Sequence, residues 1–202
     1  MKSVRHRFLI LRGGVQISTN TRVIIIVPLV VTLLISAVSG LSYLIVSASG
    51  IPARIGMPLG FRLIGLLALA IGFSLLVWLF RHRPPLDILA STYTSLTGAL
   101  TKARHIQHAH RTEPLIITGP HRFIRHPLYT AAILLLAGWW LLLDYTFLLF
   151  CTGIMTLWFN LVVAPFEERE LRALFGAQYE TYARITPRFL PSIRFRRPAR
   201  PD

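Results

Sequence analysis

A chain of 202 residues is long enough for one helical bundle, and 53% of its residues are hydrophobic. Its mean hydropathy of +0.57 favours a bundle in lipid and argues against an ordinary water-soluble domain. The formal charge of +14 would suit a nucleic-acid-binding protein, but the basic residues flank apolar runs instead of forming one face, so we expect no nucleic-acid partner.

Two apolar runs in the first half of the chain are each long enough to cross a membrane. Residues 23–46 form 24 positions without a charge, and about 20 helical residues cross the hydrocarbon core. This run exceeds the apolar part of a secretory signal peptide, which favours a retained anchor. Residues 63–80 are 18 apolar or small residues between Arg62 and Arg81, and they predict a second span.

A third apolar stretch, residues 127–165, is too long for a single crossing. Its 39 residues contain one acidic or basic residue, Asp144. Two helices that meet at Asp144 would each be close to the minimal length of a membrane span. The sequence therefore predicts a helical hairpin near the C-terminus and four spans in all.

The segments around these runs are polar and are expected at the membrane surface. Residues 86–103 mix apolar and hydroxyl side chains, a composition compatible with an interfacial helix. After Pro165, residues 167–184 have a charged, helix-like pattern. The remaining tail is rich in Pro and Arg and predicts an extended segment.

The positions of the basic residues predict the side of the membrane on which each segment lies. With four spans, both termini and residues 81–125 share one side, whereas residues 47–61 and Asp144 share the other. Of the 22 Lys and Arg residues, five precede residue 23, seven lie in 81–125 and eight follow residue 168. The positive-inside rule assigns this basic side to the cytoplasm. We expect an all-α integral membrane bundle with cytoplasmic termini and surface helices, in contact with membrane lipids of a bacterial or archaeal cytoplasmic membrane.

Two segments rich in reactive side chains lie at the two ends of the predicted hairpin. One is TGPHRFIRHPLY at residues 118–129, and the other is PFEEREL at residues 165–171. Because an antiparallel hairpin returns the chain to its starting side, His126 is expected near Glu167 and Glu168. Together these segments offer donors for a carboxylate, acidic acceptors for ammonium or hydroxyl groups, and apolar walls.

Each piece also has an ordinary structural interpretation. Basic residues at the start of a span are typical membrane anchors, and glutamates after Pro165 suit the first turn of a solvated helix. His121 and His126 are too few to define a metal site, and Cys151 is alone in an apolar segment, so we predict no metal.

Taken in order, these residues resemble the isoprenylcysteine carboxyl methyltransferase and phospholipid methyltransferase superfamily. The resemblance covers about residues 60–191 and is carried by the sequence GPHRFIRHPLY, the paired glutamates and the later aromatic positions. The corresponding residues are Gly119–Tyr129, Glu167, Glu168, Leu171, Phe175, Gly176, Tyr179, Tyr182 and Pro187–Pro191. It divides the chain into a basic segment with the first span (1–59), a membrane-embedded methyltransferase core (60–191) and a basic tail (192–202).

The resemblance implies a pocket for S-adenosylmethionine that is enclosed by the hairpin and the surface segments. The residues expected to bind this cofactor, matched by position, are Gln107, Leu115, Ile116, His121, His126, Pro127, Leu128, Tyr129, Glu167 and Glu168. Leu115 and Ile116 match the adenine side, and His121 stands where the family usually has Tyr. Glu167 and His126 are the expected catalytic residues.

One departure from the family bears on the methyl acceptor. Prenylcysteine enzymes have an Arg one helical turn before the glutamates, which helps to hold the substrate carboxylate, and Val163 occupies that position here. This change argues against an isoprenylcysteine substrate. The acceptor therefore stays open among lipidic or small carboxylates, thiols and amines.

Two other functions remain compatible with the sequence. NADPH-dependent membrane reductases of the sterol-reductase type are similar in this C-terminal pattern, although the paired glutamates and the four short spans favour methyl transfer. The departures at Val163 and His121 also suit a non-catalytic membrane adaptor that keeps the fold without the chemistry. Cofactor binding discriminates among the three functions: a methyltransferase would bind S-adenosylmethionine, a reductase would bind NADPH, and an adaptor would bind neither.

Overall fold

A computed structural model of the chain describes residues 19–88 and 115–191. These residues form helices joined by short loops, and no β-strand occurs among them. The termini, most of the predicted interfacial helix at 86–103, and Gln107 lie outside the described residues.

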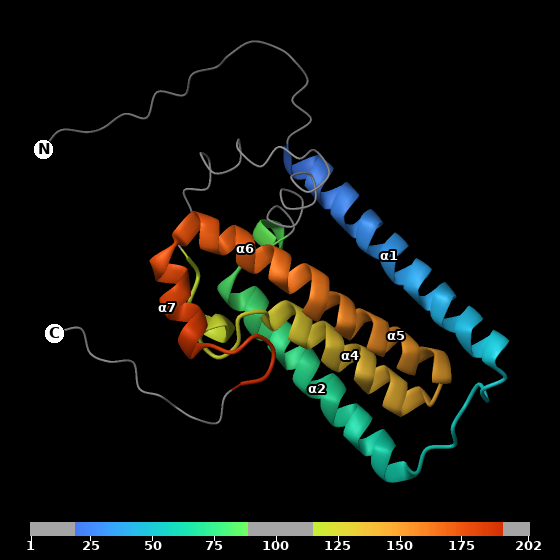
Figure 1. Cartoon of the computed structure of the whole chain (residues 1–202). Helices are drawn as coiled ribbons and strands as arrows, with labels where there is room; N and C mark the ends of the chain where they lie inside the picture. Colours follow the sequence, from blue (N-terminus) through green and yellow to red (C-terminus); the bar gives the residue numbers. More distant parts are fainter. Residues whose placement is uncertain (1–18, 89–114, 192–202) are drawn as a thin grey trace, which may run out of the picture.

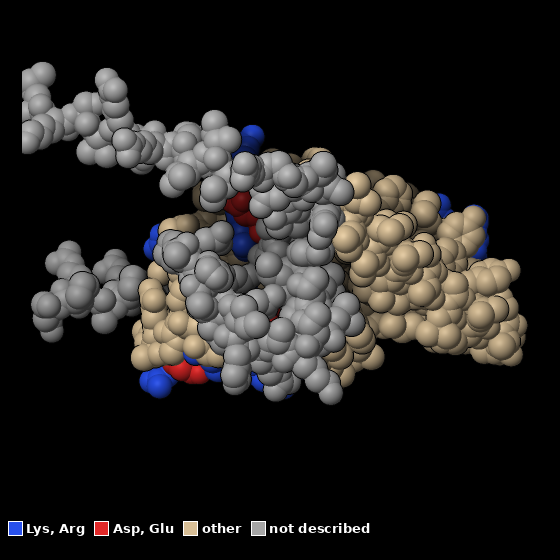
Figure 2. Space-filling view, turned by 90° about the horizontal axis from the view of Figure 1, so that it is seen from above, with Lys and Arg blue, Asp and Glu red and all other residues tan. Residues whose placement is uncertain are grey.

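Four apolar helices run side by side along the described body (Figure 1). They are α1 (Thr19–Ser49), α2 (Leu59–His82), α4 (Pro127–Leu143) and α5 (Thr146–Trp158). Three described helical stretches are long and apolar enough to cross a membrane, whereas α4 is a shorter apolar helix of 17 residues and spans about 26 Å. Figure 2 shows charged residues at both ends of the body, with uncharged described surface between them. The prediction of an all-α membrane bundle is confirmed, and the chain is an integral membrane protein.

The turn of the hairpin and the loop after α1 bind each other at one end of the bundle. Asp144 adopts a left-handed conformation (φ 60°), and its carboxylate accepts backbone N–H groups of Ile55, Gly56 and Met57 at 3.3, 2.7 and 2.9 Å. The hydrogen bond from the Met57 N–H, together with those from Gly56 and Ile55, holds the pKa of the Asp144 carboxyl below its usual range despite burial. Residues 50–58 therefore lie beside Asp144, as the four-span topology predicts.

The helix after the hairpin turn differs from the sequence prediction at Pro165, which does not interrupt it. Five residues of π-helix, η3 (Phe159–Val163), join α5 to α6 (Ala164–Phe175) without a break. In this wider turn the Ala164 N–H donates to the Phe159 carbonyl five residues earlier. The π turn changes the hydrogen-bond pattern just before the residue that lacks an N–H, so the helix continues through the proline.

The predicted charged helix over 167–184 is divided into two helices at Gly176. This glycine has φ 50°, a backbone conformation that favours glycine, and it ends α6. The chain then turns into α7 (Ala177–Ile185), which lies across the end of the bundle (Figure 1).

Close packing of α2 against α4 depends on glycines. A Cβ atom at Gly65 would lie 2.9 Å from the Gly138 carbonyl oxygen, and one at Gly138 would lie 2.7 Å from Cγ of Leu69. Both separations are shorter than van der Waals contact, so the two backbones touch where these glycines meet. On the other side of the hairpin, α1 contacts α5 through Ser39 and Cys151.

Gly138→Ala is expected to destabilise the protein by about 1 to 3 kcal/mol, because the added methyl group must displace Leu69. Gly153→Ala in α5 is the matched control, because a Cβ atom there meets nothing within 4 Å. Its effect should be neutral or stabilising, by up to about 1 kcal/mol. Thermal unfolding of detergent-purified protein measures both changes, and equal effects would contradict the close contact of α2 with α4.

Candidate functional site

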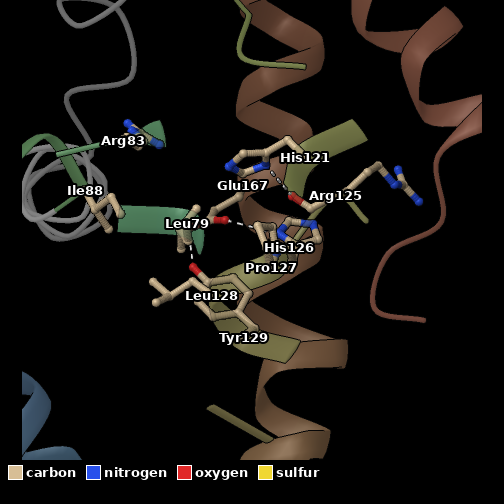
Figure 3. A pocket seen from close by; sticks show the side chains of 10 residues that line it. All are labelled: Leu79, Arg83, Ile88, His121, Arg125, His126, Pro127, Leu128, Tyr129 and Glu167. Carbon is tan, nitrogen blue, oxygen red and sulfur yellow. Dashed lines mark hydrogen bonds and ion pairs between the residues drawn. The ribbon is translucent and has the colours of Figure 1, made fainter. Parts of the chain in front are cut away.

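A pocket opens at the end of the bundle opposite Asp144, where α2, α4 and α6 meet the chain around the short 3-10 helix η2 (Gly119–Arg122) (Figure 3). The residues that line it are Leu79, Arg83, Ile88, His121, Arg125, His126, Pro127, Leu128, Tyr129 and Glu167. Apolar walls, the Arg83 guanidinium, two imidazoles and one carboxylate thus surround the same space, whereas the Arg125 guanidinium points away from it and binds Glu168 (Figure 3). This combination is typical of a site for a polar molecule that also has an apolar part.

Most of the residues predicted for the cofactor come together in this pocket. Those that line it are His121, His126, Pro127, Leu128, Tyr129 and Glu167. Leu115 and Ile116 are half-buried but do not line it, and Glu168 lies behind it. Sequence reasoning missed Leu79, Arg83 and Ile88 as lining residues, because nothing in the sequence shows that the end of α2 faces the hairpin. Arg125 lies inside the motif at residues 118–129, and its place at the start of a span also suits a membrane anchor, so the sequence alone does not assign it to the pocket.

Tyr129 and Glu167 connect the two helices of the hairpin at the pocket. The Tyr129 hydroxyl donates a hydrogen bond to Oε1 of Glu167, which points from α6 toward α4 in Figure 3. The Tyr129 ring also stacks on Phe159, the first residue of the π turn, with ring centroids 4.7 Å apart. Glu167 is therefore held in a defined position at the pocket wall.

His126 lies between the two glutamates. Its Nδ1 is 3.5 Å from Oε2 of Glu167, and its Nε2 is 3.3 Å from Oε1 of Glu168. The residue is only 5% exposed. The expected proximity of His126 to both glutamates is present, but the two carboxylates approach opposite edges of its ring.

Glu168 is a fully buried carboxylate with several cationic partners. Arg188 donates to its two oxygens at 2.8 and 2.9 Å, and Nη1 of Arg125 lies 3.1 Å from Oε1. Nη2 of Arg172 is 3.6 Å from the other oxygen. A buried carboxylate needs this compensation, because burial otherwise disfavours its charge. The hydrogen bond to Glu168 in turn raises the pKa of Arg188.

The segment that carries Arg188 lies against the start of α4. The Arg125 N–H donates to the Pro187 carbonyl at 2.8 Å, and the His126 N–H donates to the Arg188 carbonyl at 3.0 Å. The Thr130 hydroxyl donates to the Phe189 carbonyl at 3.0 Å. Residues 187–189 therefore form a strap across the motif that contains His126.

His121 presents a buried nitrogen to the pocket. Its Nδ1 lies 3.3 Å from the Arg125 carbonyl, which only accepts hydrogen bonds, so the ring proton is on Nδ1. Nε2 is buried and has no hydrogen-bond partner among residues 19–88 and 115–191. Burial lowers the pKa of His121 to about 4, so the imidazole is neutral at pH 7. The pocket therefore contains an acceptor for a hydrogen-bond donor of a ligand.

The comparisons with known proteins gave one match. A family model described as phospholipid methyltransferase covers residues 61–178, more than half of the chain. The chain belongs to the phospholipid methyltransferase family. No curated protein and no solved structure was found to match it.

The region shared with the phospholipid methyltransferase family contains all the described residues that line the pocket. The predicted superfamily resemblance is thus confirmed, and the chain is a membrane protein of a methyltransferase family. Helix α1 and the strap at 187–189 lie outside the matched region.

The lowered pKa of His121 predicts a specific pH dependence of stability. The folded state binds this proton only near pH 4, whereas the unfolded chain binds it near pH 6.5. The free energy of unfolding therefore decreases as the pH is lowered from 6.5 toward 4. The pKa difference of His121 alone should lower the free energy of unfolding by about 2 kcal/mol between pH 8 and pH 5. Thermal unfolding across this range should show a smaller loss for His121→Gln, whereas the exposed control His82→Gln should follow the unchanged protein. Identical pH slopes for all three proteins would contradict a neutral, buried His121.

Proposed function

We propose that this chain transfers a methyl group from S-adenosylmethionine to a lipidic or small-molecule acceptor at the membrane. The observation that carries the proposal is the pocket where α2, α4 and α6 meet. It combines Glu167 with Arg83, two histidines and apolar walls, and it lies within the region that matches the methyltransferase family.

The residues of the pocket fit the chemical groups of this methyl donor. Arg83 suits its carboxylate, and Glu167 suits its ammonium or sulfonium charge. The unpartnered Nε2 of His121 suits an amino or hydroxyl hydrogen of the nucleoside. Leu79 and Leu128 offer apolar walls for the heterocycle. When bound, the donor would supply a methyl group already activated by its sulfonium.

The chain's own residues then have mainly to position the reactants and to exclude water. Tyr129 holds Glu167 at the pocket wall, and the strap covers His126. Such fixed side chains reduce the loss of freedom that a reaction between two bound molecules requires. Glu167 and His126 are the proposed catalytic residues, because they can accept a proton from an acceptor that must lose one.

The proposed site lies on the side of the membrane that carries most of the basic residues. We assign this side to the cytoplasm, where the positive-inside rule places it. The methyltransferase core would comprise residues 60–191, preceded by a segment with one further span and followed by a basic tail. The π turn at Phe159–Val163 contains no cation, which argues against an isoprenylcysteine carboxylate as acceptor.

Replacing Tyr129, His126 or Glu167 by Ala should weaken binding of S-adenosylhomocysteine, the product form of the donor, by about tenfold or more. Each change removes a group that lines the pocket. Calorimetric titration of detergent-purified protein measures the affinity, and thermal unfolding reports whether each variant is folded. Glu180→Ala is a control, because this half-exposed carboxylate pairs with Arg172 away from the pocket. Normal binding by the folded Glu167→Ala variant would show that the site is wrongly assigned.

A further inference from the structure

The ring proton of His126 is fixed by its contact with Glu168. Oε1 of Glu168 lies 3.3 Å from Nε2 of His126 and also accepts a hydrogen bond from Nε of Arg188 at 2.8 Å. A carboxylate bound by Arg188 and Arg125 is ionised and has no proton to donate. The hydrogen between Glu168 and His126 must therefore belong to Nε2.

The opposite nitrogen of the same ring faces the pocket. In the neutral ring, a proton on Nε2 leaves a lone pair on Nδ1, which lies 3.5 Å from Oε2 of Glu167. The other oxygen of Glu167 already accepts the Tyr129 hydroxyl. In this neutral form two hydrogen-bond acceptors, Nδ1 of His126 and Oε2 of Glu167, face each other and can bind one proton between them.

The surroundings of His126 prevent the ring from leaving this orientation. Its backbone N–H is bound by the Arg188 carbonyl at 3.0 Å. Tyr129 and Phe189 contact the ring with centroid separations of 5.5 and 5.8 Å. Arg188 therefore acts on His126 twice, through its own carbonyl and through Glu168.

We infer that Glu168 is a positioning residue, clamped by Arg188, which sets the tautomer of His126 and so makes His126 and Glu167 an acceptor for a single proton. This inference rests on the proposed function and narrows the methyl acceptor to a group that carries a proton on its nucleophilic atom, as an amine or a thiol does. A carboxylate acceptor arrives ionised and has no proton to release.

The proton balance of the transfer is then complete within the pocket. As the nucleophilic atom of the acceptor forms its bond to the methyl carbon, the bond between that carbon and sulfur breaks and the sulfur keeps the electron pair as a neutral thioether. The acceptor releases its proton to Nδ1 of His126 or to the facing oxygen of Glu167. The positive charge that leaves sulfur is thus retained as one proton shared by this pair.

The tautomer of His126 can be measured without a methyl acceptor. In protein with ¹⁵N-labelled histidine, the His126 signals are assigned by their loss in His126→Asn, and NMR shifts distinguish the protonated ring nitrogen. We expect the Nε2–H form in the unchanged protein. In Glu168→Met the acceptor at Nε2 is lost, and the signal should shift to the Nδ1–H form, in which the ring donates to Glu167.

Two further variants keep the test decisive. Glu168→Met with Arg188→Met removes the carboxylate together with the arginine that binds both of its oxygens, so that of Arg188 and Arg125 only Arg125 loses its partner, and it should likewise shift the tautomer. Glu180→Met is the matched control, because Glu180 also pairs with an arginine but does not touch His126. An Nδ1–H form or a doubly protonated ring in the unchanged protein, or an unshifted signal in a folded Glu168 variant, would overturn the inference. Binding of S-adenosylhomocysteine by the unchanged protein is scored separately, so failure of the proposed function is distinguishable from failure of this inference.

Discussion

A single buried carboxylate, Glu168, connects three segments at the pocket end of this bundle: the start of the hairpin, the strap and α6. Glu168 belongs to α6. It binds Arg125 and His126 at the start of the hairpin and Arg188 in the strap. Removing one partner of such a buried pair typically costs about 3 to 5 kcal/mol, because a charge is left without compensation. The positions of His126 and Glu167 therefore depend on an interaction that does not itself line the pocket.

The turn of the hairpin and its open end at the pocket are each held by a buried acidic residue. At the far end, Asp144 holds the loop after α1 through three backbone N–H groups, and at the pocket end Glu168 holds side chains from two other segments. Between them, the glycine contact of α2 with α4 brings the end of α2 to the pocket. Hydrogen bonds and ion pairs at both ends, with close apolar packing in the middle, suit a bundle whose centre lies in lipid.

The sequence predicted the spans and the hairpin because long runs without charge are uncommon outside membranes, and because Asp144 marks the one break in the longest run. It also predicted that His126 would lie near the glutamates. The family resemblance singled out Glu167 as the catalytic glutamate. The residue pattern alone did not show which of the two adjacent glutamates faces the pocket, because that depends on the rotation of α6, and the π turn before Pro165 changes this rotation. The sequence indicated residues 187–189 only as part of a family motif. Their contact with the start of α4 could not be predicted, because backbone hydrogen bonds leave no pattern of side chains.

The central claim of this account is that the pocket holds a methyl donor and not a hydride donor. Parallel calorimetric titrations of the unchanged, detergent-purified protein with S-adenosylhomocysteine and with NADPH test it most directly. The account predicts saturable binding of S-adenosylhomocysteine and no binding of NADPH. Binding of NADPH alone would instead favour a membrane reductase, and binding of neither would favour a protein that keeps the fold of the family without its chemistry.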